Sequence, residues 1–146
     1  MTNYTPEDLV DHEGIAAIIL NENGEVLIQK HVKYGFWTLP VGKIKKGQSV
    51  IDGLKEELYD ECGIIPTDYK QIMHKKYRYM RLKKKIIVNC YLFDIKNYTG
   101  TLINKEPHKH TTQTFMTIDA IKKLSYLSDL TLLYLDYKGF KRKARI

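Results

Sequence analysis

The sequence contains few of the residues that staple small domains. Its only two cysteines, Cys62 and Cys90, lie far apart and form no Cys-x-x-Cys pair. This argues against a disulfide framework and against a zinc site built from cysteine pairs. It also fits a reducing compartment, and we therefore expect a cytoplasmic protein.

Long hydrophobic stretches are also missing. No apolar run approaches the ~20 residues that span a bilayer, and the polar, acidic segment 1–14 does not resemble a signal peptide. We therefore expect no membrane partner. The 146 residues contain no repeat or linker, which predicts one domain over 1–146 with a short basic tail, Lys138 to Arg145. Its state is expected to be a monomer or a homodimer.

Positive charge is in excess. The net charge is +7, mostly from lysine. The basic residues gather at Lys43, Lys45 and Lys46, between 75 and 85, and in the tail. This balance favours polyanionic ligands such as nucleotides, polyphosphates or RNA. For any single cluster, a solubilising surface is the alternative.

The pattern of apolar residues predicts a mixed α/β fold. Apolar runs bounded by turn residues indicate strands. The predicted strands are 14–20, 25–29, 69–81, 86–95 and 112–118, with an extended segment at 37–40, a lysine-rich loop at 42–47 and a turn at 82–85. The predicted helices are 49–62, one that begins at 119, and 127–137. This order predicts a mixed sheet that helices cover on both faces.

The first predicted helix has clear ends and a charged face. Ser49 can cap its start, and Gly63 can end it. Glu57, Asp60 and Glu61 have i, i+3 and i+4 spacing, so their carboxylates lie on one face. Because such like charges repel, a hard divalent ion such as Mg²⁺ or Mn²⁺ would be favoured there. A solvated acidic face is the alternative.

The segment before this helix favours the metal interpretation. Residues 39–47 are rich in glycine and lysine and include Gly42 and Lys43. A loop that neutralises phosphate, placed beside a cluster of carboxylates, is what metal-assisted phosphoryl chemistry requires.

Residues 42–64 resemble the Nudix box, G-x5-E-x7-R-E-U-x-E-E-x-G-U, in which U is a bulky aliphatic residue. The sequence reads G-x5-Q-x7-E-E-L-x-D-E-x-G-I, with the spacing intact. The preceding segment 35–43 is similar to the W-x-L-P-G-G-K lead-in, and segments 104–109 and 115–121 resemble MutT-like members. The resemblance covers roughly residues 13 to 124 and implies a Nudix-type α/β/α sandwich.

Two positions of the box depart from the family pattern together. Gln48 and Glu56 stand where the family has Glu and Arg, whose salt bridge is expected to brace the loop against the helix. A hydrogen bond between the amide and the carboxylate could replace that bridge. Asp60 is a shorter acid than the usual Glu. Because Glu57 and Glu61 are retained, an active enzyme is favoured over a binding module without turnover.

The resemblance implies roles for the residues of the box. Glu57 and Glu61 are expected to bind the metal, Asp60 to assist, and the Gly42 carbonyl to complete the shell. Mg²⁺ is the expected cofactor, with Mn²⁺ as the alternative. Glu57 is one candidate for the general base. Glu106 is expected to act as a further ligand or as that base, although it could be a turn residue placed before Pro107 by chance.

Substrate contacts are expected from Lys43, Trp37 and Tyr79. Lys43 would contact a phosphate as a point charge. Trp37 is either a core aromatic residue or a platform on which a base stacks. Tyr79 lies 16 residues after Gly63, a weak match to dinucleoside polyphosphate hydrolases. His108 and His110 are expected in a solvated loop, because no third metal ligand is evident.

The expected activity is hydrolysis of a pyrophosphate bond in a nucleoside diphosphate-X compound. A modified nucleoside triphosphate, cleaved to monophosphate and pyrophosphate, is the preferred substrate. The alternatives are a dinucleoside polyphosphate hydrolase, an enzyme that removes pyrophosphate or a cap from RNA 5′ ends, and a nucleotide-binding sensor without turnover. An ADP-ribose substrate is disfavoured, because no proline lies between Pro66 and Pro107.

Overall fold

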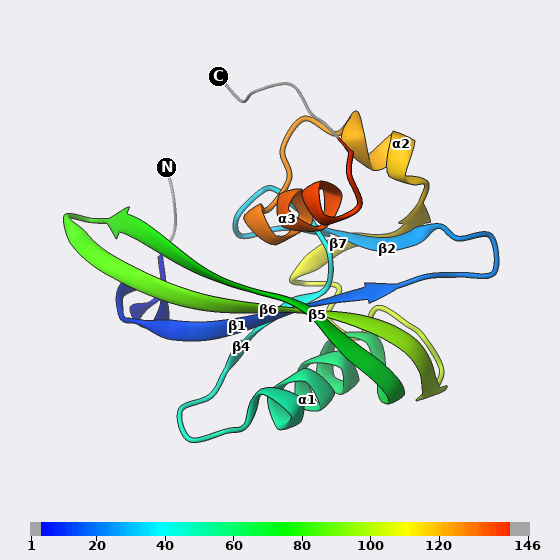
Figure 1. Ribbon diagram of the computed structural model, residues 1–146, viewed down its shortest axis with the longest axis horizontal. Coiled ribbons are helices and arrows are strands. Elements are labelled where there is room, and N and C mark those ends of the chain that lie inside the picture. The colour runs from blue at the N-terminus through cyan, green and yellow to red at the C-terminus, as the bar shows by residue number, and fades with distance from the viewer. Residues whose placement is uncertain (1–3, 141–146) are drawn as a thin grey trace.

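The structure, a computed structural model, describes residues 4–140 and contains two sheets (Figure 1). The four-stranded sheet has the order β4 (Val41–Ile44), β1 (His12–Ile19), β6 (Lys84–Gly100), β5 (Ile64–Arg81), and the three-stranded sheet has the order β3 (Trp37–Thr38), β2 (Val26–His31), β7 (His110–Met116). The helices are the 3₁₀ helix η1 (Pro6–Leu9), α1 (Val50–Cys62), α2 (Ile118–Lys122) and α3 (Asp129–Tyr137). Because β1 runs parallel to β6 while the other pairs are antiparallel, the larger sheet is mixed, as predicted.

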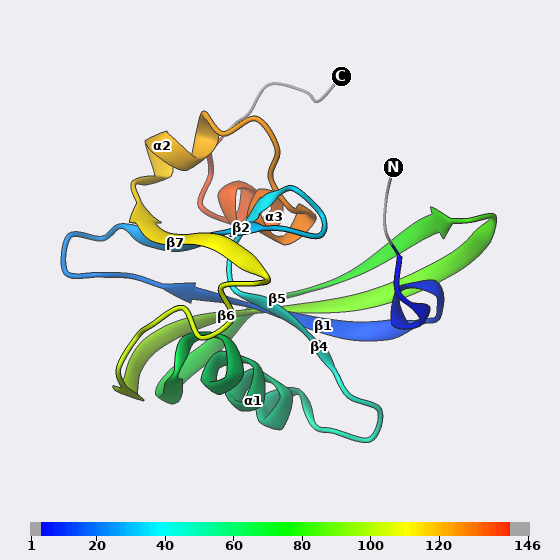
Figure 2. The ribbon, with the colours of Figure 1, turned by 180° about the vertical axis from the view of Figure 1, so that it is seen from behind.

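Helices lie on both sides of the strands, with α1 on one side and α2 and α3 on the other (Figures 1 and 2). Strand β1 contributes to both resulting cores. Ile15, Ala17 and Ile19 belong to the core on the α1 side, while Ala16 and Ile18 belong to the core on the α2 and α3 side. A strand that is buried on both faces is continuously apolar rather than alternating. This confirms the α/β/α arrangement and explains the apolar run.

Helix α1 has the predicted ends. The Ser49 hydroxyl accepts a hydrogen bond from the Asp52 backbone N–H at 3.1 Å, and Gly63 ends the helix in the left-handed conformation with φ 74°. Gly53 lets the helix approach β4, because a Cβ at this position would lie 3.0 Å from Ile44 Cγ1. The helix is therefore held against the strand that precedes it.

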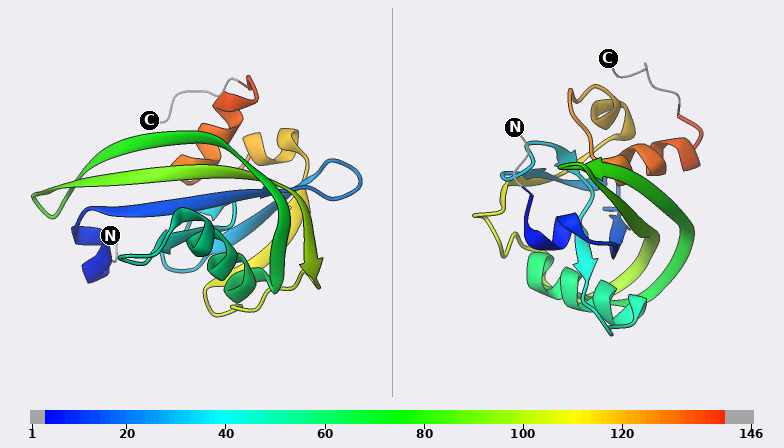
Figure 3. Two further views of the ribbon diagram at one scale, coloured as in Figure 1. Left: turned by 60° about the horizontal axis from the view of Figure 1, so that its bottom comes forward. Right: turned by 90° about the vertical axis from the view of Figure 1, so that its left-hand side faces the viewer.

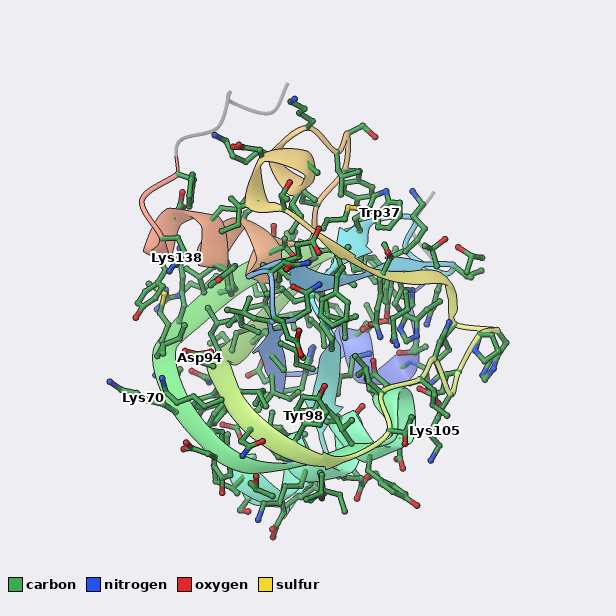
Figure 4. The ribbon with its side chains drawn as sticks, turned by 90° about the vertical axis from the view of Figure 1, so that its right-hand side faces the viewer. Trp37, Lys70, Asp94, Tyr98, Lys105 and Lys138 are labelled. Atoms are coloured by element: carbon green, nitrogen blue, oxygen red, sulfur yellow. The ribbon has the colours of Figure 1, made fainter. Side chains whose placement is uncertain are left out.

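The β5–β6 hairpin is longer than predicted. The sequence predicted strands at 69–81 and 86–95, but β5 starts directly after Gly63 and β6 continues to Gly100. Its turn consists of Leu82 and Lys83 alone, with φ 48° and 67°. Figure 3 shows the hairpin curving around α1 at one end and projecting beyond the other strands at its tip. In Figure 4, Lys70 points away from the outer side of this curve and Tyr98 lies on the inner side.

Other element predictions need correction. The lysine-rich loop predicted at 42–47 is wrong at its start, because Val41–Ile44 pairs with β1 as strand β4. Strand β7 covers His110–Met116 rather than 112–118, and η1 was not predicted. Backbone pairing decided these segments, and it leaves little trace in short polar sequences.

None of the helices in the part of the chain that the structure describes is long and apolar enough to cross a membrane. Most of the predicted basic tail, from residue 141 onward, lies outside the described residues.

Candidate active site

A cavity of about 1000 Å³ brings the start of the chain, the β2–β3 loop, β4, α1 and the β5–β6 hairpin together. Strand β4 contributes Gly42 and Lys43, and α1 contributes Glu57. Lys109, which precedes β7, also lines the cavity. The carboxylate of Glu57, the backbone of Gly42 and the side chains of Lys43 and Lys109 therefore face the same cavity.

The absence of a side chain at Gly42 makes room for Glu57. A Cβ atom at Gly42 would overlap Cγ and Cδ of Glu57. The pairing of Ile15 with Gly42 fixes β4 against β1, so this close approach is a property of the sheet and not of a loop. Glycine is consequently the residue that lets the Glu57 carboxyl group lie against the backbone of β4.

The carboxyl groups of Glu57 and Glu61 lie on one face of α1, as their i, i+4 spacing predicted, and share a hydrogen bond that was not predicted. Burial raises the pKa of Glu61 well above its usual range, and the hydrogen bond that its protonated carboxyl group donates to Glu57 raises it further. Burial also raises the pKa of Glu57. Glu61 is only 4% exposed, and its Oε1 atom has no hydrogen-bond partner among the described residues. The described residues therefore do not supply enough positive charge to keep both acids ionised, and a bound cation would.

This donor set suits a divalent ion of the magnesium type. The carboxylates of Glu57 and Glu61 supply oxygen atoms, the ligands that Mg²⁺ prefers, and the Oε1 atom of Glu61 has no hydrogen-bond partner among the described residues. The role of the Gly42 carbonyl as a further ligand stays a prediction. Among residues 4–140, no three metal-binding side chains converge. Mg²⁺ is usually held by one or two carboxylates together with substrate phosphates, so a complete cage of side chains is not needed.

Asp60 and Glu106 lie at the edge of this arrangement. The negative charge of each raises the pKa of Glu57, which indicates that both are near it. Asp60 is exposed on α1, and Glu106 forms an ion pair with Lys109 at 3.2 Å. Neither lines the cavity in the described part of the chain. Their roles as metal ligand and general base stay predictions.

Lys43 is held by a residue that the sequence did not single out. Its Nζ lies 2.7 Å from Oδ1 of Asp8, a buried carboxylate in η1. Burial alone would raise the pKa of Asp8, but hydrogen bonds from Lys43 and the Thr5 backbone outweigh it and hold that pKa far below its usual range. Asp8 also lines the cavity. No sequence signal in the polar N-terminal segment marks this contact.

The two aromatic candidates from the sequence take different places. Trp37 packs against the core on the α2 and α3 side and does not line the cavity in the described part of the chain, which favours its interpretation as a core residue (Figure 4). Tyr79 does line the cavity. Its hydroxyl donates to Asp129 Oδ2 at 2.6 Å, its ring stacks on that of Tyr77, and the Arg81 guanidinium lies 4.4 Å from it.

The hydrogen bond expected between the two unusual box residues is present. Gln48 Nε2 donates to Glu56 Oε2 at 3.1 Å, and Gln48 Oε1 accepts from the Lys45 backbone N–H at 3.1 Å. Lys45 also forms an ion pair with Glu56. The loop before α1 is thus braced against the helix without the family's salt bridge.

The prediction of a solvated loop for His110 is wrong. His110 begins β7, is 2% exposed, and has its Nε2 atom 3.6 Å from Glu61 Oε1. Burial lowers its pKa, so the ring is neutral at pH 7. His108 is exposed and lines the cavity. The burial of His110 was not evident because β7 starts at this residue, two residues before the predicted boundary.

The match to known proteins covers most of the chain. The NUDIX domain family matches residues 10–133. The chain is 32% identical to the RNA pyrophosphohydrolase of Acinetobacter baylyi over 47% of this chain and 43% of that protein, and 34% identical to that of Ruthia magnifica over 50% and 42%. These matches span less than half the length of each curated relative.

Solved structures share the fold. The MutT NUDIX hydrolase from Burkholderia pseudomallei superposes with a TM-score of 0.71 at 21% identity, over 86% of this chain and 96% of that one. A C. elegans Ap4A hydrolase has a TM-score of 0.63 at 17% identity, over 88% and 96%. The chain therefore belongs to the NUDIX domain family and has the fold of the MutT Nudix hydrolases.

Proposed function

We propose that the protein is a metal-dependent pyrophosphohydrolase that cleaves nucleoside diphosphate-X compounds, with modified nucleoside triphosphates as the preferred substrates and a monophosphate and pyrophosphate as products. The observation that carries this proposal is the hydrogen-bonded pair Glu57 and Glu61, because Glu57 lies against Gly42 and lines a cavity that cations also line. Burial raises the pKa of both acids, and acids with raised pKa values beside a cavity are typical of a site that performs chemistry rather than of a solvated helix face.

Glu57, Glu61 and the Gly42 carbonyl would hold the metal, with Asp60 assisting from the same helix. When bound, a divalent ion offsets phosphate charge and acidifies water. Glu61 is buried and Glu57 faces the cavity, so the two acids connect the core with the open side of the site. The hydrogen bond between Gln48 and Glu56 ties the loop after β4 to α1. It therefore helps to hold Gly42, in β4, beside the acids of α1.

The remaining residues act on the substrate. Lys43 and Lys109 lie where they can neutralise phosphate oxygens. The oxygen of a water molecule forms a bond to one phosphorus while the bond from that phosphorus to the bridging oxygen breaks, and the bridging oxygen leaves with the other phosphoryl group. A carboxylate, Glu106 or Glu57, accepts the proton that this water loses.

A second candidate function is removal of pyrophosphate from RNA 5′ ends. The curated relatives named above are RNA pyrophosphohydrolases. In this chain, the projecting hairpin carries exposed lysines that could contact an RNA backbone, namely Lys75, Lys76, Lys83, Lys84 and Lys85.

Product analysis separates these functions. The protein is incubated with Mg²⁺ in ¹⁸O-labelled water and given nucleoside triphosphates, dinucleoside polyphosphates or 5′-triphosphate RNA, and the products are identified by mass. We expect labelled monophosphate or pyrophosphate from free triphosphates. If Lys75→Gln together with Lys76→Gln weakens turnover of RNA alone and flattens its salt dependence, the RNA substrate takes precedence. Absence of turnover on every substrate would contradict the proposed activity.

A pH-dependent stability change is expected from Glu61. Because its folded pKa is raised, the folded state holds a proton that the unfolded state releases, so this stability is present below the ordinary pKa and is lost as pH rises through the raised value. Thermal unfolding in EDTA should show Tm falling from pH 5 to pH 8. Mg²⁺ should raise Tm more at pH 8, because the ion replaces the proton. Glu61→Gln should flatten both dependences, and unchanged dependences in that variant would contradict the assignment of the metal site.

A further inference from the structure

Four aromatic side chains form a continuous wall along one side of the cavity. His31, Tyr34 and Phe36 come from the β2–β3 loop, and Tyr126 comes from the segment before α3; all four line the cavity. The ring centroids are 4.7 Å apart for His31 and Tyr34, 5.3 Å for Tyr34 and Phe36, and 5.7 Å for Phe36 and Tyr126. We call these four residues the aromatic wall.

The loop that presents the wall is rigidly built. The His31 backbone N–H donates to the Phe36 carbonyl at 2.9 Å, and Gly35 N–H donates to the His31 carbonyl at 2.9 Å. The His31 ring accepts hydrogen bonds at Nδ1 from the backbone N–H groups of Lys33 and Tyr34, at 3.2 and 3.4 Å. Burial and the neighbouring His110 lower the pKa of His31 to about 4, so the ring is neutral and able to accept them at pH 7. The rings are therefore in place before a ligand arrives.

The wall connects directly to the cations of the site. The Tyr34 hydroxyl donates to Asp8 Oδ2 at 3.2 Å, and Asp8 holds Lys43 at 2.7 Å and Lys33 at 4.0 Å. Lys43 is the neighbour of Gly42 in β4. The aromatic wall thus begins beside the cations at Tyr34 and continues through Phe36 to Tyr126. A nucleotide has a matching polarity, with a polyphosphate at one end and a flat base at the other.

We propose that the aromatic wall is the subsite for the nucleobase, with the base stacked on the rings while the phosphates extend toward Lys43 and Glu57. This assignment rests on the proposed function. Two other aromatic residues fit the role less well. The ring of Tyr79 already stacks on Tyr77 and carries the Arg81 guanidinium, and Trp37 packs into the core. Stacking tolerates every base, so the rings supply binding strength for the base, and a preference for modified bases has to come from other contacts.

Binding of a non-hydrolysable nucleoside triphosphate analogue, with methylene between the α- and β-phosphorus atoms, tests the subsite, and inorganic tripolyphosphate serves as the probe without a base. Phe36→Leu and Tyr126→Leu remove a ring while keeping apolar volume. Each should weaken binding of the analogue by roughly 5- to 100-fold and leave the affinity for tripolyphosphate unchanged. Tyr126→Phe and Phe36→Trp, which keep a ring, should bind the analogue about as well as the wild type does. Tyr137→Leu is the matched control. Tyr137 lies on α3, is exposed to a similar degree as Tyr126 (48% against 44%), and is not among the described residues that line the cavity.

The outcomes separate this inference from the proposed activity. Two results would overturn the base subsite. One is an equal loss of affinity for the analogue and for tripolyphosphate. The other is unchanged affinity for the analogue in both leucine variants when their Tm equals that of the wild type. If the wild type binds the analogue through the wall but cleaves no nucleotide, the subsite stands and the proposed hydrolysis fails. If turnover is normal in the leucine variants with unchanged KM, the hydrolysis stands and the subsite fails.

Discussion

Glu57→Gln and Glu61→Gln should each lower kcat by about 100-fold or more, with KM changed much less. Each substitution removes a negative charge from the pair that the metal would neutralise, and the loss of one such electrostatic contact in a transition state amounts to about 2.7 kcal/mol. Both variants should fold, because glutamine keeps the size of each side chain and replaces an acid whose burial disfavours its charged form. Steady-state kinetics in Mg²⁺, with thermal unfolding in EDTA, would measure both effects.

Glu56→Gln is the matched control for these variants. Glu56 precedes Glu57 on the same helix, but its carboxylate pairs with Lys45 and Gln48 instead of Glu61. Loss of such a surface pair should leave kcat within about threefold. Near-wild-type turnover in either Glu57→Gln or Glu61→Gln would refute the assignment of these two acids.

Gly42→Ala should lower kcat by on the order of 100-fold while the protein remains folded. The added methyl group would occupy the space of Cγ and Cδ of Glu57, so the carboxyl group must move away from β4. A displacement of about 1 Å is enough for a loss of this size. Stability should change little, since only a flexible side chain has to move and alanine reduces the freedom of the unfolded chain.

Gly14→Ala provides the control for this substitution. Gly14 lies in β1 beside Lys43, and a Cβ there would meet only the Gly42 carbonyl oxygen, at 3.4 Å. It adds the same methyl group to the same pair of strands without touching Glu57. A loss of activity in Gly14→Ala that equals the loss in Gly42→Ala would mean that the sheet, and not the Glu57 carboxyl group, is responsible.

The elements that could be predicted are those whose signals lie close together in the sequence. Ser49 and Gly63 mark the ends of α1 through local hydrogen bonds and a left-handed φ, and both positions are as expected. The i, i+4 spacing places Glu57 beside Glu61 by helix geometry alone. The hydrogen bond from Gln48 to Glu56 was likewise predictable, because loop and helix are adjacent in the chain.

The elements that escaped prediction depend on distant partners. Strand β4 forms because Gly42 and Lys43 pair with Ile15 and Gly14, which lie far away in the sequence. Its four residues, with glycine and lysine in the middle, do not by themselves indicate a strand. His110 is buried against Glu61 only because β7 is brought beside β2. The β5–β6 hairpin extends beyond its predicted ends since each strand continues as long as the other offers backbone partners.

The same distinction, between local signals and distant contacts, applies to the candidate site. The sequence by itself determined the pair of acids, the glycine beside them and the membership of the family, because these depend on fixed spacing within one loop and one helix. Only the tertiary structure decided which side chains complete the cavity. Asp8, Tyr34 and Tyr126 reach the cavity from elements separated by 26 residues or more. No local pattern encodes such contacts, because they arise when the sheets and helices pack together and not from the conformation of any one segment.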